Sequence, residues 1–337
     1  MKIIIAAGGS GGHLYPALAL AEHLKKNIDC RIYLVKSNRE IENKIVKNNG
    51  YVDEVINLDM IGLSRKLSLK NAVTFYKLFK ALIRSKKLLR KIKPDVVIGM
   101  GGYVSFPIIY SAKKYRTIIH EQNVIPGLVN KMLSKNVNDI LISFEESRKY
   151  FDKKCILIKN PRVLNLMPIS SYSNRILIVG GSQGSELIND AIIKQYDKLK
   201  DKEITFITGD KHYKDVVSKI SDTTTFKIIS YLDNFTDELK KAKLIVCRSG
   251  ATTISEIIEL LIPSVLIPST YVSNNHQMLN AKVLTDNKAA IFLIEDELAN
   301  LHEVINIDQI KLEEIKGNLL EIKNKEYTDV LSVIKGR

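Results

Sequence analysis

The sequence has few of the features that mark metal centres, secreted proteins and membrane spans. Its three cysteines, Cys30, Cys155 and Cys247, lie more than 90 residues apart, so no two share the spacing of a metal site. We expect buried thiols in a reducing compartment. No run approaches the ~18 apolar residues of a membrane-spanning helix. The first apolar run, at 2–7, is too short for a secretory signal and leads into glycines, so we expect a cytoplasmic protein.

Two common nucleotide-binding motifs are also missing. None of the glycine-rich turns is followed by Lys and then Ser or Thr, as the phosphate loop of a nucleotide hydrolase requires. The first turn, at 8–12, packs its glycines as Gly-Gly-x-Gly-Gly, and the next apolar run ends IYLVKSN without the acidic residue that binds a ribose in dinucleotide-dependent enzymes. The sequence therefore disfavours a dehydrogenase.

The composition is that of a globular protein of two domains. Hydrophobic residues make up 45% and charged residues 26% of the 337 residues, and a prior of ~150 residues per domain gives two. The charge is divided unevenly. Residues 1–161 hold 29 Lys and Arg against 13 Asp and Glu, whereas residues 162–337 hold 22 against 24. The basic first half points to an anionic partner, either a nucleic acid or a membrane.

Short β-branched runs alternate with helical patterns along the chain. The runs are continuously apolar, which is typical of parallel strands covered by helices on both faces. They predict strands at 2–7, 30–35, 95–100, 116–120, 139–144, 155–159, 175–180, 203–208, 226–230, 243–247, 264–268 and 289–294. We predict two doubly wound α/β domains, 1–161 and 162–337, with a last helix at about 319–337 that packs back on the first domain.

Three glycine turns follow predicted strands. GGSGGH at 8–13 and GGSQGS at 180–185 share four of six positions, and the first ends in His13 where the second ends in Ser185. GMGGYVSFP at 99–107 is the third turn. A strand that enters a helix through such a turn leaves backbone N–H groups unblocked at the positive end of the helix dipole, where a phosphate or diphosphate fits. Each turn alone is equally well explained as a tight turn.

The stretch VCRSGATTISE at 246–256 is another polar turn between a strand and a helix. We expect Thr252 or Thr253 to cap this helix. Glu256 is suited to accept the hydroxyl protons of a ribose; the alternative is that it only complements the helix dipole.

Two further polar clusters suit a ligand. His276, Gln277 and Asn280 begin a predicted helix and match sugar hydroxyls, although they also fit a plain polar helix entry. HEQN at 120–123 directly follows a strand, at the edge where open α/β sheets bind ligands.

The segment 60–93 contains 11 Lys and Arg and no acidic residue. Apolar side chains recur in it at helical spacing: Leu69, Val73, Tyr76, Phe79, Leu82 and Ile83, with Phe75 and Leu78 beside them. A basic amphipathic helix with aromatics is typical of an element at an anionic membrane surface, and the alternative is a helix whose apolar side is core. A solvated face normally mixes charges of both signs, so we favour peripheral membrane attachment.

Taken in order, these motifs resemble those of one family over residues 2 to about 293. It is the MurG family, the N-acetylglucosaminyltransferases of peptidoglycan synthesis, which move GlcNAc from UDP-GlcNAc to the MurNAc C4 hydroxyl of lipid I to form lipid II. The motifs are GGSGGHLYPALALA, GMGGYVSFP, HEQNVIPGLVNK, GGSQGS, CRSGATTISE and NNHQMLNA. The resemblance implies an inverting enzyme of GT-B architecture, two Rossmann-like domains facing across a cleft, on the cytoplasmic side of the cell membrane.

The resemblance also implies roles for single residues. Those facing the acceptor diphosphate are Ser10, Gly11 and Gly12, together with Gly101, Gly102 and Tyr103. Those binding the donor nucleotide are Ser182 and Gln183 at the diphosphate, Leu232 at the uracil, and Ala251, Thr252, Thr253, Ile254, Ser255 and Glu256 at the nucleotide and ribose. Asn123 and Gln277 contact the transferred sugar, and Arg162 completes the substrate-binding set.

Three positions depart from the family pattern. The motif Gly-Asn-Pro-x-Arg is shortened to KNPRV, which puts the role of Arg162 in doubt. Phe106 replaces a glycine, which would narrow the acceptor side, and Ser10 replaces a threonine but keeps the hydroxyl.

Two diphosphate substrates explain the duplicated turn, and a single proton transfer explains why only one copy carries an imidazole. Inverting transfer needs a base for the acceptor hydroxyl, and His13 is the candidate, with Glu121 and His120 as competitors. The other roles open to His13 are a hydrogen bond to the acceptor phosphate and a helix cap. No Asp-x-Asp pair occurs, so we predict no cofactor and no obligatory metal; backbone donors would stabilise the departing UDP.

Three alternatives stay open. A UDP-sugar transferase with another lipid acceptor, such as diacylglycerol, would share the fold and the basic face. A UDP-GlcNAc 2-epimerase would need no basic face. A nucleic-acid-binding module is disfavoured because no DNA- or RNA-binding motif appears. The expected partners are UDP-GlcNAc, lipid I and an anionic membrane at 60–93, without nucleic acid.

Overall fold

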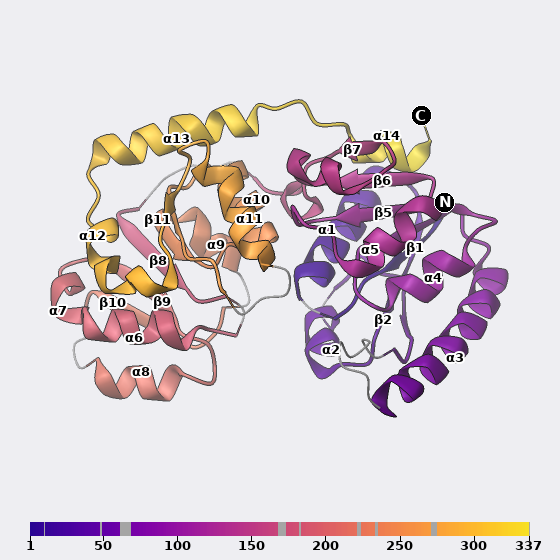
Figure 1. Ribbon diagram of the computed structural model, residues 1–337, viewed down its shortest axis with the longest axis horizontal. Helices are drawn as coiled ribbons and strands as arrows, with labels where there is room; N and C mark the ends of the chain where they lie inside the picture. The colour runs from indigo at the N-terminus through magenta and orange to yellow at the C-terminus, as the bar shows by residue number, and fades with distance from the viewer. Residues whose placement is uncertain are drawn as a thin grey trace. The chain divides into compact units, whose positions relative to one another are not determined.

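The computed structural model describes residues 1–9, 11–47, 49–60, 69–167, 173–181, 183–220, 224–232, 235–270 and 275–336, without the side chains of 69–72. The chain forms two compact units. Unit 1 is Met1–Leu166 with Tyr327–Arg337, and unit 2 is Met167–Glu326 (Figure 1).

Unit 1 is a parallel sheet of seven strands in its described part, in the order β3-β2-β1-β4-β5-β6-β7. The strands are β1 (Lys2–Ala6), β2 (Arg31–Lys36), β3 (Glu54–Asn57), β4 (Val96–Gly99), β5 (Arg116–Glu121), β6 (Asp139–Ile142) and β7 (Cys155–Leu157). The helices are α1 (Gly11–Asn27), α2 (Glu40–Val46), α3 (Leu69–Ile92), α4 (Ser105–Ser111), α5 (Leu128–Leu133) and α14 (Val330–Lys335), with 3-10 turns η1 (Ser134–Asn136), η2 (Glu145–Tyr150) and η3 (Pro161–Val163).

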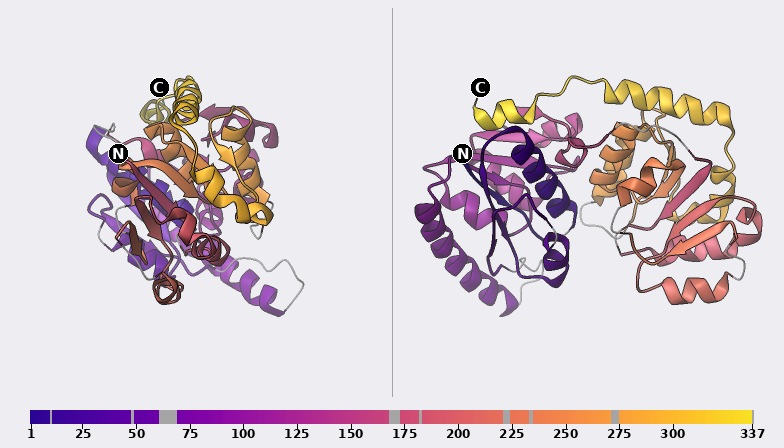
Figure 2. Two further views of the ribbon diagram at one scale, coloured as in Figure 1. Left: turned by 90° about the vertical axis from the view of Figure 1, so that its left-hand side faces the viewer. Right: turned by 180° about the vertical axis from the view of Figure 1, so that it is seen from behind.

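Helices cover both faces of this sheet (Figure 1, and from behind in Figure 2, right). In β1, Ile3 and Ile5 pack in the cluster that α1, α2 and α14 complete, whereas Ile4 packs in the cluster of α3, α4 and α5. Successive strand side chains point to opposite faces, so a strand buried on both sides must be apolar throughout. All three isoleucines are fully buried, and each contributes about 1.5–3 kcal/mol of burial free energy.

Unit 2 repeats the plan with six strands in the order β10-β9-β8-β11-β12-β13, again counting only described residues. The strands are β8 (Arg175–Val179), β9 (Ile204–Ile207), β10 (Phe226–Ile229), β11 (Ala242–Cys247), β12 (Ser264–Leu266) and β13 (Ile291–Phe292). The helices are α6 (Glu186–Lys194), α7 (Tyr196–Leu199), α8 (Tyr213–Lys219), α9 (Phe235–Lys240), α10 (Ala251–Leu260), α11 (His276–Thr285), α12 (Leu301–Ile305) and α13 (Gln309–Lys323), with η5 (Glu295–Asn300).

The strand order reverses once in each sheet. In unit 1 the first strand lies between β2 and β4, and in unit 2 the equivalent β8 lies between β9 and β11. Crossover connections leave such a switch point in opposite directions, so the carboxyl ends of the two central strands border an open crevice where doubly wound folds bind ligands. The two predicted Rossmann-like α/β sheets are confirmed, and the glycine turns follow the strands at these switch points.

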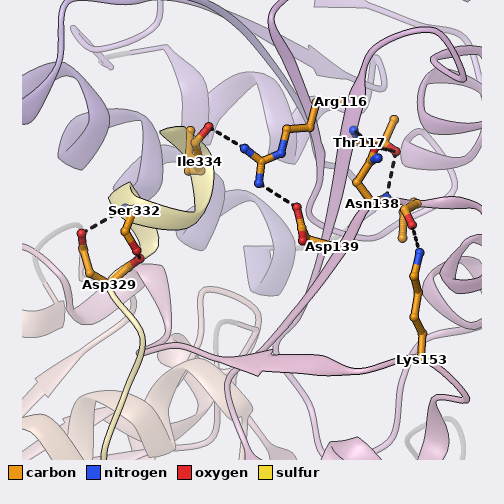
Figure 3. Close-up of polar contacts among 9 residues, drawn as sticks. Arg116, Thr117, Asn138, Asp139, Lys153, Asp329, Ser332 and Ile334 are labelled. Atoms are coloured by element: carbon orange, nitrogen blue, oxygen red, sulfur yellow. Dashed lines mark hydrogen bonds and ion pairs between the residues drawn. The ribbon is translucent and has the colours of Figure 1, made fainter. Parts of the chain in front are cut away.

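The ends of the units differ from the prediction. The chain leaves unit 1 after Leu166, so Arg162 belongs to unit 1 and not to the second domain. The expected last helix is two helices, α13 in unit 2 and α14 in unit 1. Arg116 on β5 holds α14 by donating from Nη1 to Ile334 O at 3.3 Å, and its Nη2 lies 2.8 Å from Asp139 (Figure 3). The turn at 324–329 interrupts the helical pattern, and Asp329 caps α14.

Candidate active site

At the switch point of unit 1, the turns after β1 and β4 lie in direct contact. Gly102 has a φ of +79°, and a Cβ there would lie 2.0 Å from Gly8 O. Gly101 has a φ of +99°, and a Cβ there would lie 2.6 Å from Cδ2 of His13. The Ser105 hydroxyl joins the same turns, 2.8 Å from Ala6 O and 2.7 Å from Gly101 O. Only glycine combines these φ angles with so close an approach.

His13 lies in the first turn of α1 and is half-buried. Its Nδ1 is 3.1 Å from Gly8 O. A carbonyl oxygen only accepts hydrogen bonds, so Nδ1 carries the proton and the lone pair of the neutral ring is on Nε2. The imidazole is thus held in the tautomer that accepts a proton at Nε2.

The two competing bases have structural partners instead. His120 is fully buried, with Nε2 2.9 Å from Ser143 Oγ. Burial, with a smaller effect of the His13 charge, lowers the pKa of His120 to about 3. Glu121 is also buried, and its carboxylate accepts from the Asn123 and Gly127 amides, both at 3.0 Å, and from Asn130 Nδ2 at 2.8 Å. These bonds shape the loop that follows β5.

The rest of the HEQN motif links neighbouring turns. β5 runs to Glu121, so the first two residues of the motif belong to the strand and only Gln122 and Asn123 follow it. Gln122 donates to Met100 O at 2.9 Å, which joins the loop after β5 to the turn after β4. Asn123 is half-buried, and its backbone carbonyl accepts from the Ser147 hydroxyl at 2.9 Å.

Arg162 lies beside the first turn. Its guanidinium is 5.4 Å from the Tyr15 ring centroid on α1, and the Tyr15 ring in turn would lie 2.9 Å from a Cβ at Gly11. The shortened KNPRV motif therefore still brings a cation to the start of α1. Gly12 and Tyr103 are both exposed. Phe106 stacks on Tyr110 within α4, with ring centroids 5.5 Å apart.

In unit 2, the turn after β8 also has glycines with positive φ angles that closely approach a neighbouring backbone. Gly181 and Gly184 have φ of +97° and +79°, and a Cβ at Gly184 would lie 2.0 Å from Thr208 O. Ser185 caps α6 by accepting from Ile188 N. Gln183 is exposed on this turn. Ser182, like Ser10 in unit 1, lies outside the described residues.

A half-buried ion pair lies behind this turn, and sequence reasoning missed it. Arg248, at the end of β11, donates from Nη2 to Ser185 Oγ at 2.7 Å, and its Nη1 lies 2.7 Å from Glu295 Oε1. Burial alone would raise the pKa of Glu295, but hydrogen bonds from Thr270 and the charge of Arg248 hold it below its ordinary value. Arg248 stands inside the RSGATT motif, but Glu295 is 47 residues further on and carries no signal of its own.

The helix after β11 begins differently from the prediction. α10 starts at Ala251 with Gly250 as N-cap and without a side-chain cap, so neither Thr252 nor Thr253 caps it. Both threonines are half-buried in its first turn, whereas Ala251, Ile254 and Ser255 are buried.

Glu256 follows one turn later in α10 and is buried, accepting from the Thr236 hydroxyl at 3.0 Å. It tethers α9 to α10 in this structure. Leu232 is half-buried in the segment that precedes α9.

The start of α11 closes the unit 2 site. α11 begins at His276, as predicted. The carboxamide oxygen of Gln277 accepts from Ser269 N at 2.8 Å, which fixes the orientation of the carboxamide and of its NH₂ group. The Ser249 hydroxyl donates to the backbone carbonyl of Gln277 at 2.8 Å. Asn280 is fully buried and donates to Ser249 O at 3.3 Å, so it orders the turn.

The two halves of the chain match two halves of one family. Residues 3–142 match the glycosyltransferase family 28 N-terminal domain, and residues 175–327 match the family 28 C-terminal domain. The relatives include proteins named UDP-N-acetylglucosamine--N-acetylmuramyl-(pentapeptide) pyrophosphoryl-undecaprenol N-acetylglucosamine transferase. That of Bacillus subtilis is 39% identical over 336 residues, or 93% of this chain and 92% of its own. That of Alkaliphilus metalliredigens is 36% identical and covers 100% of this chain and 95% of its own.

The chain belongs to the MurG family of glycosyltransferases. The crystal structure of Acinetobacter baumannii MurG has the same fold, with a TM-score of 0.76 and 24% identity over 99% of this chain and 98% of that one. A UDP-N-acetylglucosamine 2-epimerase also shares the fold, with a TM-score of 0.67 and 14% identity over 99% and 94% of the two chains. As a MurG-family member the chain is an enzyme, a glycosyltransferase of peptidoglycan synthesis.

Proposed function

We propose that this enzyme transfers GlcNAc from UDP-GlcNAc to the MurNAc C4 hydroxyl of lipid I, with inversion at the anomeric carbon, and so forms lipid II. The observation that carries the proposal is the full-length similarity to transferases whose names contain both substrates. The geometry agrees with it, because each unit has a glycine turn at its switch point, and two diphosphate-bearing substrates need two such turns.

We assign the acceptor to unit 1 and the donor to unit 2. In the acceptor site, His13 takes the proton of the attacking hydroxyl at Nε2. The tautomer fixed by Gly8 O supports this assignment, as do the buried, bonded positions of His120 and Glu121. Asn123 and Gln277 contact the transferred sugar, and the Arg162 guanidinium beside α1 faces the anionic acceptor.

The departing UDP leaves from the donor turn of unit 2. The first turn of α10 has backbone N–H groups and no side-chain cap, and Arg248, whose charge is paired with Glu295, donates a hydrogen bond to Ser185 behind the other turn. Such fixed donors stabilise charge as it develops on the leaving diphosphate. We propose that transfer needs no cofactor and no metal ion.

We also propose that the enzyme attaches peripherally to the cytoplasmic face of an anionic membrane through α3. No helix among the described residues has both the length and the apolar character for crossing a bilayer. On α3, five apolar side chains are exposed instead of packing in the core: Val73, Phe75, Tyr76, Phe79 and Ile83. The core side of the helix is formed by Ala81, Leu89 and Ile92. A carrier lipid would bring the acceptor to the same surface.

Cations line a groove beside these apolar residues. The groove has a volume of about 410 Å³. Its walls are Leu58, Asp59, Lys77, Lys80, Ala81, Ile83, Arg84 and Lys87. Four cations against one carboxylate, next to exposed aromatic rings, are the combination that binds lipid phosphates at an interface.

The test is transfer of labelled GlcNAc from UDP-GlcNAc to a lipid I analogue in the presence of EDTA, with diacylglycerol as a parallel acceptor. Label on the lipid I analogue alone supports donor, acceptor and metal independence together. Label on diacylglycerol instead refutes the acceptor, and activity restored only by a divalent ion refutes the metal independence.

A further inference from the structure

A buried carboxylate lies behind the acceptor turn of unit 1. Glu42 on α2 is fully buried. Its Oε1 accepts hydrogen bonds from the Gly9 N–H at 2.7 Å and from the Ser37 hydroxyl at 2.6 Å. Its Oε2 is buried without a hydrogen-bond partner among the described residues. Burying a carboxylate costs free energy, so a fully buried glutamate with one unpartnered oxygen indicates a role beyond packing.

The Gly8–Gly9 peptide connects this carboxylate to His13. The N–H of the peptide belongs to Gly9 and donates to Glu42, and the C=O belongs to Gly8 and accepts from His13 Nδ1 at 3.1 Å. The two groups lie in one plane and point in opposite directions. Carboxylate, peptide and imidazole therefore form one continuous series of hydrogen bonds, and bonds in series polarise one another.

We propose that Glu42 is a positioning residue for the base. Through the Gly8–Gly9 peptide it holds His13 in the tautomer with the Nε2 lone pair and stabilises the imidazolium that forms when Nε2 takes the proton of the acceptor hydroxyl. Only that proton moves; the Nδ1–H and the Gly9 N–H stay in place. A carboxylate bonded directly to an imidazole has the same effect in hydrolytic triads. The inference rests on the proposed function, in which His13 is the base.

Three other charged or titratable groups face this series. Lys36 on β2 is buried and donates to Asn57 Oδ1 at 2.9 Å; burial lowers its pKa, and the charge of Glu42 opposes that effect. Arg39, which precedes α2, donates from Nη1 to Gly9 O at 3.1 Å. His120 on β5 is uncharged at neutral pH, because burial lowers its pKa to about 3. Glu42 is thus the anion of the cluster, and Lys36 and Arg39 are its cations.

The test compares Glu42→Gln with Lys36→Gln. The carboxamide of Glu42→Gln keeps an oxygen for the Gly9 N–H but removes the negative charge. The NMR titration midpoint of His13 should therefore fall by about half a pH unit or more. The midpoint of the acidic limb of the kcat–pH profile should move to lower pH by the same amount. The value of kcat should drop about 10-fold to 100-fold, while the KM for UDP-GlcNAc stays within about twofold. Lys36→Gln removes a cation, so it should raise the His13 midpoint. Loosened packing would shift both variants in the same direction.

The outcomes separate this inference from the proposed function. An unchanged His13 midpoint in Glu42→Gln, or a fall of equal size in both variants, overturns the role of Glu42. If the midpoint moves but the rate profile does not follow it, the base assignment fails and the coupling of Glu42 to His13 stands. Should Glu42→Gln not fold, Lys36→Gln decides alone: a midpoint above that of the wild type supports the inference, and one at or below it overturns it.

Discussion

His13 and its counterpart Ser185 differ in the contacts that their side chains make with the surrounding turns. In unit 2 the equivalent position caps a helix and accepts from Arg248. In unit 1 the imidazole packs against Gly101 and bonds to Gly8 O, so two glycine turns are needed to hold one ring. Comparison of the two glycine motifs singled out His13 and predicted the turn that precedes it. It did not predict Glu42, because the contact joins residues 33 positions apart.

Replacement of His13 by Ala should lower kcat by about 10²-fold to 10⁴-fold, the range for loss of a general base. The Kd for UDP-GlcNAc, measured by calorimetry, should change by less than about twofold, because we assign the donor site to the other unit. His23→Ala is the matched control, since His23 lies on the same helix and bonds to Asn165 at 3.1 Å. Equal losses in kcat and donor affinity for His13→Ala would move the base elsewhere.

His120 gives a stability prediction with a definite sign. Its folded pKa of about 3 lies below its ordinary value of 6.5, so the unfolded chain binds a proton that the folded chain refuses. The stabilisation is complete above about pH 6.5 and is lost as the pH falls toward 3. In His120→Gln, the urea midpoint should therefore decline less between pH 7 and pH 4.5 than in the wild type. Parallel declines would show that the imidazole is not buried as described.

At the scale of elements, the apolar runs were enough to locate twelve of the strands, since a strand buried on both faces carries its signal in its own residues. They missed β3. In this edge strand only Ile56 is half-buried and the other three residues are exposed, so it has no apolar run to detect. The cap of α10 was also predicted wrongly, because Thr252 and Thr253 are the second and third residues of a helix that begins at Ala251, with Gly250 as its N-cap.

The α3 surface can be tested by one aromatic side chain. Phe79 is 64% exposed. Phe79→Ser should weaken binding to anionic vesicles about tenfold, because an inserted ring contributes burial free energy. Ile310→Ser, 82% exposed on α13, is the control and should bind as the wild type does. High salt should weaken vesicle binding of the wild type and of the Ile310→Ser control. Vesicle binding that is unaffected by salt and by Phe79→Ser would contradict attachment through α3.

The contact between the two acceptor turns predicts a difference between glycines. Gly102→Ala introduces a Cβ 2.0 Å from Gly8 O at a φ of +79°, so the free energy of unfolding should fall by about 2 kcal/mol or more. Gly317 lies inside α13, where such a Cβ would have no neighbour within 4 Å apart from the backbone of its own helix, and Gly317→Ala should stabilise by about 0.5–1 kcal/mol. Denaturant unfolding measures both. Equal effects would mean that the turns do not touch.

At the scale of the whole molecule, periodicity predicted two doubly wound units, which the structure confirms, and the glycine turns follow the central strands of both sheets. The sequence analysis expected one last helix at about 319–337 to pack back on the first domain. It did not predict the break that leaves only residues 327–337 in unit 1, because a six-residue helix with three buried side chains resembles any helix end. The Arg248–Glu295 and Glu42–Gly9 contacts were missed for a similar reason. Each joins residues far apart in the chain, and only the folded sheet brings them together.

The central claim is that unit 2 holds the donor and unit 1 the acceptor. The most direct test is amide hydrogen exchange of the full chain with and without saturating UDP. We expect slower exchange in the turn between β8 and α6 and in the first turn of α10, and unchanged exchange in the turns after β1 and β4. Protection by UDP in the turns after β1 and β4, with none in unit 2, would contradict the assignment.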